Sequence, residues 1–165
     1  MDAAPLDQAV FRRVAGRFPT GVCVLSAVDE GRDHAMTASA FTTVSMDPML
    51  VLACVETDAR FHDAIVAAGR WAVSILDETA RPVSEWLATR GRPLDGQLDR
   101  VPFRRGPVTG AALVEQAVGW LEVTTTAVHP GGDHSIVVGQ VVHLELGPPT
   151  SQPLVYHRSS YHKLS

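Results

Sequence analysis

The stretch from residue 34 to residue 65 carries the densest set of side chains suited to binding a polar ligand. It reads HAMTASAFTTVSMDPMLVLACVETDARFHDAI, and five hydroxyl side chains stand among small residues in its first half: Thr37, Ser39, Thr42, Thr43 and Ser45. Short hydroxyl groups with small neighbours let a backbone approach a flat polar ligand and form hydrogen bonds with it. A β-barrel hairpin with Thr and Ser on its solvent face has the same composition, so both interpretations stay open.

Histidine and cysteine are the next candidates for chemistry, because they bind metals and act as nucleophiles. Seven histidines are present, but they are scattered, and neither an HExxH nor a CxxC pattern accompanies them. We therefore expect no metal site. Cys23 and Cys54 each lie in an apolar, strand-like run. This setting favours buried, reduced thiols over a disulfide or a catalytic nucleophile.

The elements that must position these side chains can be predicted from the spacing of apolar residues. Helical spacing indicates helices at 6–18, 60–68 and 78–90. Alternating or β-branched apolar runs indicate strands at 20–28, 50–55, 71–76, 111–114, 118–129, 134–146, 154–157 and 161–164. The stretch 91–110, rich in Gly, Pro, Arg and Asp, is the least regular part. A mobile flap, a partner-binding excursion and a plain surface loop all fit it.

Many strands joined by short turns, with a few helices at fixed points, predict a mainly β fold: a barrel capped by short helices. A length of 165 residues suits one core and not two, so we expect a single domain over 1–165. The net charge of −4 provides no basic stripe, which argues against a nucleic-acid partner. Neither a signal peptide nor a membrane-length apolar run is present, so we expect no membrane partner and a cytoplasmic location.

Short motifs follow one another in a fixed order along nearly the whole chain. They are Phe-Pro-Thr-Gly-Val at 18–22, His-Ala-Met-Thr-Ala-Ser at 34–39, Phe-Thr-Thr-Val-Ser at 41–45, Asp-Pro at 47–48, Ala-Arg at 59–60, His-Asp-Ala-Ile at 62–65, Gly-Asp-His at 132–134, Val-Gly at 138–139 and Pro-Leu-Val-Tyr-His at 153–157. This ordered set resembles the flavin reductase family, the short-chain NAD(P)H:flavin oxidoreductases of two-component monooxygenases. The resemblance implies a Greek-key split β-barrel and a homodimer with the flavin near the subunit interface.

The resemblance also implies a reaction: hydride transfer from NADH, or alternatively NADPH, to FAD or FMN, with reduced flavin exported to a separate flavin-dependent monooxygenase. The nicotinamide and flavin rings must stack with C4 and N5 aligned, so positioning is most of the catalysis. Donors are needed along the pyrimidine edge of the isoalloxazine, where negative charge grows on reduction. The residues expected to contact the flavin are Thr37, Ala38 and Ser39, with Val44 and Ser45 facing them, and Val55. No GxGxxG follows a strand, so no Rossmann domain is expected.

The flavin phosphate is the next part of the ligand to be held. In the resembling family, hydroxyl residues around the Ala-Arg pair bind it together with the arginine. Here Arg60 begins an expected helix, where amide donors and the helix dipole favour an anion. Asp58 and Phe61 stand where hydroxyls are usual, and Thr57 is expected to compensate. Asp58 would repel a phosphate unless Arg60 pairs with it, so the phosphate is either held loosely, as suits a flavin that is released, or displaced.

Two residues late in the chain complete the predicted site. By its resemblance to the family motif, His134 is expected at the mouth of the pocket, in contact with the nicotinamide or its pyrophosphate; a solvated hairpin histidine is the alternative. Tyr161 is expected to close the pocket unless it packs in the core. Two rival functions stay open at this point. One is a non-catalytic split barrel that carries or senses flavin, haem or another flat ligand, and the other is a structural dimerisation domain.

Overall fold

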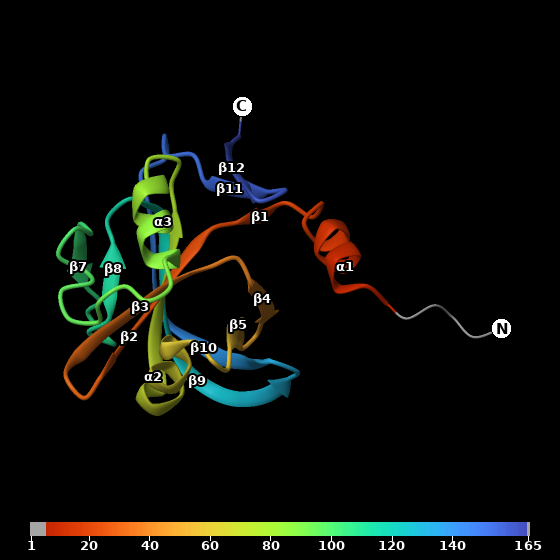
Figure 1. Cartoon of the computed structure of the whole chain (residues 1–165). Coiled ribbons are helices and arrows are strands. Elements are labelled where there is room, and N and C mark those ends of the chain that lie inside the picture. The colour runs from red at the N-terminus through yellow and green to blue at the C-terminus, as the bar shows by residue number, and fades with distance from the viewer. Residues whose placement is uncertain (1–5, 165) are drawn as a thin grey trace.

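An antiparallel sheet forms the centre of the computed structural model, which describes residues 6–164 (Figure 1). Its strands are β2 (Cys23–Asp29), β3 (Arg32–Ala38), β4 (Phe41–Met46), β5 (Met49–Glu56), β6 (Arg70–Leu76), β9 (Ala117–Gly131) and β10 (His134–Leu146). Neighbours in the sheet follow the order β3-β2-β6-β9-β10-β5-β4, and every pairing is antiparallel. The predicted mainly β architecture with short helices is confirmed.

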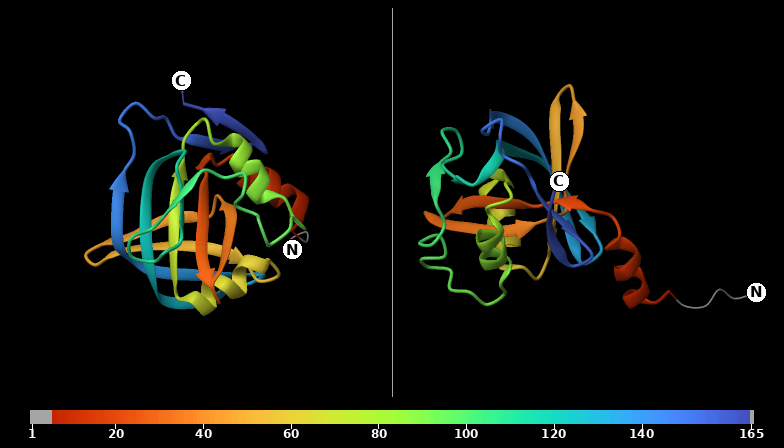
Figure 2. Two further views of the ribbon diagram at one scale, coloured as in Figure 1. Left: turned by 90° about the vertical axis from the view of Figure 1, so that its left-hand side faces the viewer. Right: turned by 90° about the horizontal axis from the view of Figure 1, so that it is seen from above.

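The sheet curls around an apolar interior, and among the described strands its two edge strands do not pair with each other (Figure 2). These edges are β3 and β4, and only Ser39 and Ala40 separate them in the chain. At this corner the Cys54 amide of β5 donates a hydrogen bond to the Ala40 carbonyl at 2.9 Å. Among the described strands no pairing joins β3 to β5, so the barrel is split along this side.

Completely buried side chains fill the barrel interior, among them Leu25, Trp71, Val73 and Val123. The helix α2 (Arg60–Ala68) closes one end of the barrel and contributes Phe61 and Ile65 to the same core. Gly69 follows it with a φ of 61°, a left-handed conformation that glycine adopts without steric cost. The helix predicted at 60–68 therefore has the predicted bounds and the predicted end.

A second layer covers the outer face of β2 and β3. It consists of α3 (Arg81–Ala88), the hairpin of β7 (Phe103–Arg105) and β8 (Ala112–Val114), and the small sheet of β1 (Thr20–Gly21), β11 (Leu154–His157) and β12 (Ser160–Lys163). The helix α3 begins later than the predicted residue 78, because the Asp77 carboxylate accepts the Thr79 amide at 2.8 Å and forms a turn there. Pro82 lies in the first turn, as predicted.

The irregular stretch 91–110 is anchored to this second layer. The Trp86 indole donates to the Gln97 carbonyl at 2.7 Å, and the Gln97 amide donates to the Asp33 carbonyl at 2.8 Å. Leu98 and Val101 are buried in the second core. The contacts hold the stretch against α3 and β3, where it can line a pocket.

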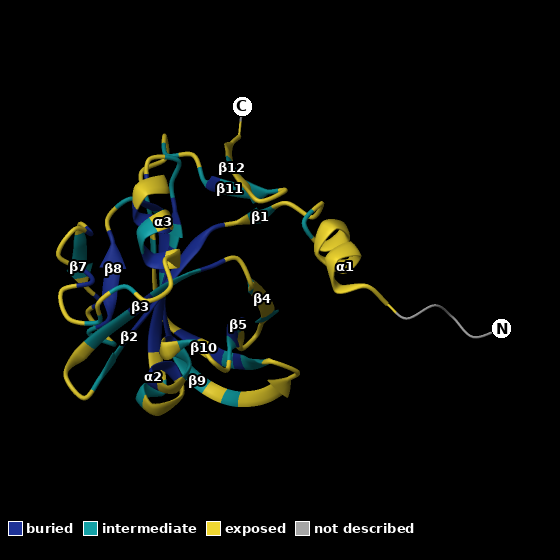
Figure 3. Cartoon of the chain, in the orientation of Figure 1, coloured by how far each residue is buried: buried dark blue, intermediate teal, exposed yellow. Residues whose placement is uncertain are grey.

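The helix α1 (Gln8–Ala15) stands away from the sheet and buries none of its residues (Figures 1 and 3). Its N-terminus is capped by Asp7, whose carboxylate accepts the Ala9 amide at 2.7 Å, so the helix is shorter than the predicted 6–18. Phe11 is 70% exposed and Val14 63%. The apolar face expected from the spacing is therefore present but uncovered. No helix in residues 6–164 has the length and apolar character needed to cross a membrane.

Candidate functional site

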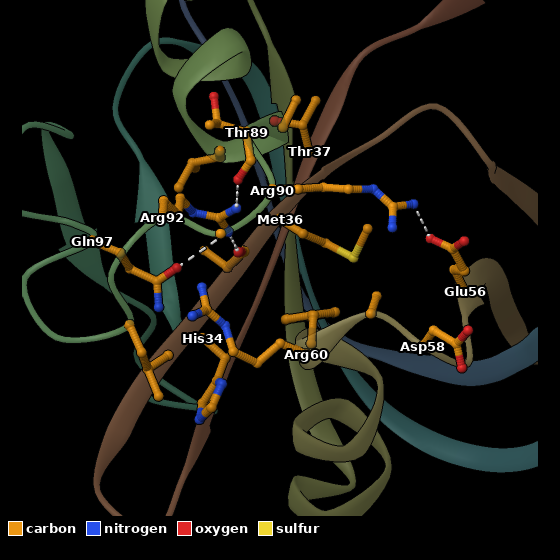
Figure 4. Close-up of a pocket in the computed structure, with 17 residues that line it drawn as sticks. His34, Met36, Thr37, Glu56, Asp58, Arg60, Thr89, Arg90, Arg92 and Gln97 are labelled. Carbon is orange, nitrogen blue, oxygen red and sulfur yellow. Dashed lines mark hydrogen bonds and ion pairs between the residues drawn. The ribbon is translucent and has the colours of Figure 1, made fainter.

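A pocket of about 400 Å³ lies in the split of the barrel (Figure 4). One wall is β3, through residues 34–37, and the opposite wall is the turn from β5 into α2, residues 56–61. The end of α3 and the stretch that follows it, residues 87–97, form the third wall. Ligand pockets in proteins commonly have volumes of about 300–1,000 Å³, so this one is large enough for part of a nucleotide.

One end of the pocket is cationic. The Arg92 guanidinium donates to the Thr89 carbonyl at 2.9 Å, to the Gln97 side chain at 3.2 Å and to the Ala35 carbonyl. The Arg60 side chain points toward Arg92, with His34 on its other side (Figure 4). Burial lowers the pKa of Arg92 below its ordinary value, and the nearby charge of Arg60 lowers it further. An anion placed here would relieve this repulsion.

The other end of the pocket carries both signs of charge. Arg90 pairs with Glu56 at 2.5 Å across the opening between the third wall and β5. Asp58 lies on this side, whereas the guanidinium of Arg60 points to the opposite end (Figure 4). Among the described residues there is no ion pair between Asp58 and Arg60. The pairing considered from the sequence is therefore absent, and the positive end of the pocket is displaced away from Asp58.

The end of β3 is the predicted flavin-binding edge, and it adjoins the pocket. Thr37 lines the pocket, and its hydroxyl donates to the Ser84 carbonyl of α3 at 2.7 Å. The Ala38 side chain is buried, whereas Ser39 is exposed. The main-chain groups of an edge strand alternate in direction, and the Ala35 carbonyl points away from β2 to Arg92. The Thr37 amide and carbonyl, two residues on, therefore face the split as well.

The remaining residues of the predicted flavin contact lie elsewhere around the opening. Val44 is 51% exposed on β4, next to a bulge in the pairing of β4 with β5, and Ser45 follows it. The Val55 side chain is completely buried in the barrel core, so only its main chain is available to a ligand. The Thr57 hydroxyl donates to the Asp133 carbonyl at 3.1 Å. Of the predicted residues, only Thr37 and Arg60 line the pocket itself.

His134 lies at the rim of this region. It stands directly opposite Glu56 in the pairing of β10 with β5, so both side chains extend from the same face of the sheet. Its Nδ1 lies 2.7 Å from the Asp133 carboxylate, and this hydrogen bond lowers the pKa of that carboxyl. The His134 side chain is 41% exposed. Its ring is therefore held on one side and open to solvent on the other.

Tyr161 packs on the second core rather than in the pocket. Its hydroxyl lies 2.8 Å from the Ser84 hydroxyl, and the main-chain carbonyl of Ser84 accepts the hydrogen bond from the Thr37 hydroxyl. The Tyr156 ring packs edge-on against it, with centroids 5.3 Å apart. Tyr161 thus supports the helix residue that fixes Thr37. A role in closing the pocket stays a prediction.

Several pocket residues were not identified from the sequence: His34, Glu56, Arg90, Arg92 and Gln97. Three of them lie at or beyond the end of α3, next to or within the stretch that the sequence indicates only as irregular. The signal available was the presence of two arginines around a glycine, and this pattern is common on exposed loops. Within residues 6–164 no three His, Cys, Asp or Glu side chains converge as metal ligands would.

Comparison with known proteins identifies the family. The model of the flavin reductase like domain matches residues 15–165, so the chain belongs to this family. An NADH-dependent FAD reductase of Streptomyces globisporus is 40% identical over 139 residues, which are 84% of this chain and 76% of that protein.

Two solved structures extend the comparison. BorF, the flavin reductase component of a bacterial two-component tryptophan halogenase, has a TM-score of 0.90 and 38% identity, with 96% of this chain and 98% of that one covered. The NADH:FAD oxidoreductase SgcE6 of Streptomyces globisporus C-1027, in complex with NAD and FAD fragments, has a TM-score of 0.91 and 32% identity over 99% and 98% of the two chains. The likeness extends over nearly the whole of each protein.

Proposed function

We propose that this protein is an NADH-dependent flavin reductase that reduces FAD or FMN and supplies the reduced flavin to a separate monooxygenase. The observation that carries the proposal is the pocket in the split of the barrel, bounded by the open edge of β3 and by Arg60 and Arg92. An open strand edge suits a flat, hydrogen-bonding ring, and guanidinium groups suit phosphate. A single domain over residues 1–165 would contain both the strand edge and the guanidinium groups.

In this proposal the flavin ring lies beside Thr37, Ala38 and Ser39. The main-chain donors that face the split bind the pyrimidine edge and stabilise the negative charge that develops when a hydride arrives from nicotinamide C4 at flavin N5. Val44, Ser45 and the main chain near Val55 surround the ring. No side chain has to transfer a proton, because catalysis comes from alignment of the two rings.

The other predicted residues act on the two substrates separately. Arg60, at the start of α2, binds the flavin phosphate. Thr57, bonded to the Asp133 carbonyl, fixes the turn that carries His134. His134 contacts the nicotinamide substrate from the rim of the pocket. NADH is the preferred donor in this proposal, with NADPH as the alternative, because the related FAD reductases of Streptomyces globisporus use NADH. Reduced cysteines and the use of NADH fit a cytoplasmic location.

We infer that the functional unit is a homodimer. The apolar face of α1, with Phe11 and Val14, is uncovered, and Met46 at the tip of the β4–β5 hairpin is 84% exposed (Figure 3). An exposed apolar helix face of this kind is a common sign of a protein interface. Substituting Phe11→Glu should convert the dimer to a monomer in light scattering after size-exclusion chromatography. A monomeric wild-type protein would contradict this inference.

A steady-state assay tests the activity. The purified protein is mixed with NADH and either FAD or FMN, and the loss of NADH absorbance is followed. We expect oxidation that depends on flavin and on enzyme concentration. Oxidation no faster than the enzyme-free background would refute the reductase. A protein that retains a flat ligand tightly but does not turn over would instead support the carrier or sensor function.

A further inference from the structure

The hairpin tip that carries His134, residues 131–135, is held in place from both sides of this histidine. On one side the Asp133 carbonyl accepts two hydrogen bonds from Thr57, from the amide at 2.9 Å and from the hydroxyl at 3.1 Å. On the other side the Ser135 hydroxyl lies 2.9 Å from Nε2 of His62, a residue of α2. Because His134 is the outermost residue of β10 in its pairing with β5, these contacts fix the tip where the strand pairing ends.

The His62 ring is oriented for this contact. Its side chain is 17% exposed, and its Nδ1 lies 3.0 Å from the Asp63 carboxylate. A carboxylate only accepts hydrogen bonds, so Nδ1 carries the hydrogen, and Nε2 of the neutral ring accepts one from the Ser135 hydroxyl. Both ring nitrogens are therefore in use. His62 does not line the pocket, so its contacts are separate from those assigned to the flavin.

We propose that His62 is a positioning residue for hydride transfer: through Ser135 it holds the hairpin tip so that His134 presents the nicotinamide to the flavin ring. The inference rests on the proposed flavin reductase function and adds to it a residue that touches neither substrate. Thr57 and His62 lie on either side of Arg60, the residue assigned to the flavin phosphate. One short segment, residues 57–62, therefore fixes the sites of both substrates relative to each other.

The physical reason is the steep dependence of hydride transfer on geometry. Nicotinamide C4 must align with flavin N5, and a displacement of about 1 Å can lower the rate about a hundredfold. When the His62 contact is lost, the Thr57 bonds still attach the tip at Asp133, but its other side is free to move. NADH should then bind less tightly and in poorer alignment. The flavin should keep its contacts on β3 and α2.

Single-turnover reduction of FAD in the absence of oxygen tests this proposal. Enzyme and FAD are mixed with increasing concentrations of NADH, and the loss of oxidised-flavin absorbance gives the limiting rate of reduction and the apparent Kd for NADH. The Kd for FAD is measured separately by flavin fluorescence.

The variants separate the hydrogen bond from the presence of the ring. They are His62→Ala, His62→Gln, His62→Asn, Ser135→Ala and the double variant of His62→Ala with Ser135→Ala. The Gln amide reaches the position of the histidine Nε2, whereas the shorter Asn amide reaches only that of Nδ1. Val66→Ala is the control, because Val66 lies in the same helix but is 42% exposed.

We expect His62→Ala to lower the limiting rate about tenfold and to raise the apparent Kd for NADH about two- to tenfold. The Kd for FAD should change less than about twofold, because no flavin contact is lost. Ser135→Ala should have the same effects, and the double variant should be no slower than either single variant, because both remove one hydrogen bond. His62→Gln should recover most of the wild-type rate, His62→Asn should resemble His62→Ala, and Val66→Ala should match the wild type.

Three results would overturn the proposal. The first is a wild-type rate and NADH affinity in both His62→Ala and Ser135→Ala. The second is a loss of FAD affinity as large as the loss of NADH affinity, which would mean that His62 only holds α2 in place. The third is equal behaviour of His62→Gln and His62→Asn. If His62→Ala does not fold, Ser135→Ala and His62→Gln decide by the same criteria. Failure of the wild type to reduce FAD would instead remove the proposed function itself.

Discussion

Replacing His134 by alanine should separate the two substrates of the proposed reaction. The His134 ring is held by Asp133 at 2.7 Å and faces the same side of the sheet as Glu56, whose carboxylate reaches the pocket. One ring nitrogen is therefore in use, while the other side of the ring is open to a ligand. Because the flavin is assigned to β3 and α2, the loss of this ring should affect the nicotinamide substrate.

The size of the effect follows from one hydrogen bond or ring contact. A single hydrogen bond contributes about 0.5–1.5 kcal/mol, so KM for NADH should rise about two- to tenfold in His134→Ala. KM for FAD should change less than about twofold, because no flavin contact is lost. Asp133→Asn retains the ring but weakens its orientation, so a smaller rise in the same direction is expected.

Initial rates of NADH oxidation measure both constants, with one substrate varied while the other is saturating. His129→Ala is the matched control, because His129 lies on the same hairpin opposite Ile136 and is exposed. It should leave both constants unchanged. Equal increases in the two constants for His134→Ala, or the same effect in His129→Ala, would refute the assignment of His134 to the nicotinamide.

Three further predictions concern individual groups. The Asp133 carboxyl should titrate below its ordinary pKa of 3.8 because of its hydrogen bond to His134. The contribution of this hydrogen bond to folding stability should be lost as the pH falls through the lowered pKa. Carbon NMR measures the midpoint of the Asp133 titration. Burial raises the pKa of Cys23 to about 12, so iodoacetamide at pH 8 should label Cys54 first in mass spectrometry. Glu122→Leu should lower the free energy of unfolding in urea by about 2–4 kcal/mol.

Each of these predictions has a contradicting outcome. The Asp133 midpoint should return toward 3.8 in His134→Ala, and an unchanged midpoint would exclude the hydrogen bond as the cause. Rapid labelling of Cys23 in the folded protein would show that it is not buried. Glu122 is fully buried and accepts hydrogen bonds from the Thr109 amide at 2.6 Å and the Thr109 hydroxyl at 2.7 Å. If the urea midpoint of Glu122→Leu equals that of the wild type, the hydrogen bonds of Glu122 with Thr109 do not stabilise the fold, and the prediction is wrong.

The sequence by itself determined where α2 and five of the seven barrel strands lie, whereas the edge strands β3 and β4 were not predicted as strands. The signals of the predicted elements are local: β-branched and apolar residues alternate or run together within one element, and Gly69 ends α2 at the predicted position. The ordered motifs also indicated the family, because they cover nearly the whole chain. The helix α1 was predicted correctly in type, although the spacing alone did not reveal that its apolar face would be uncovered.

Only the tertiary structure decided which charges share the pocket. Arg92 reaches the Ala35 carbonyl from 57 positions away, and Arg60 turns toward Arg92 rather than toward Asp58. These contacts depend on how the stretch 91–110 packs against α3 and β3, and its buried Leu98 gives no periodic signal in the sequence. Local patterns report elements, whereas the meeting of distant side chains depends on packing between elements, and that packing forms the ligand-binding end of this protein.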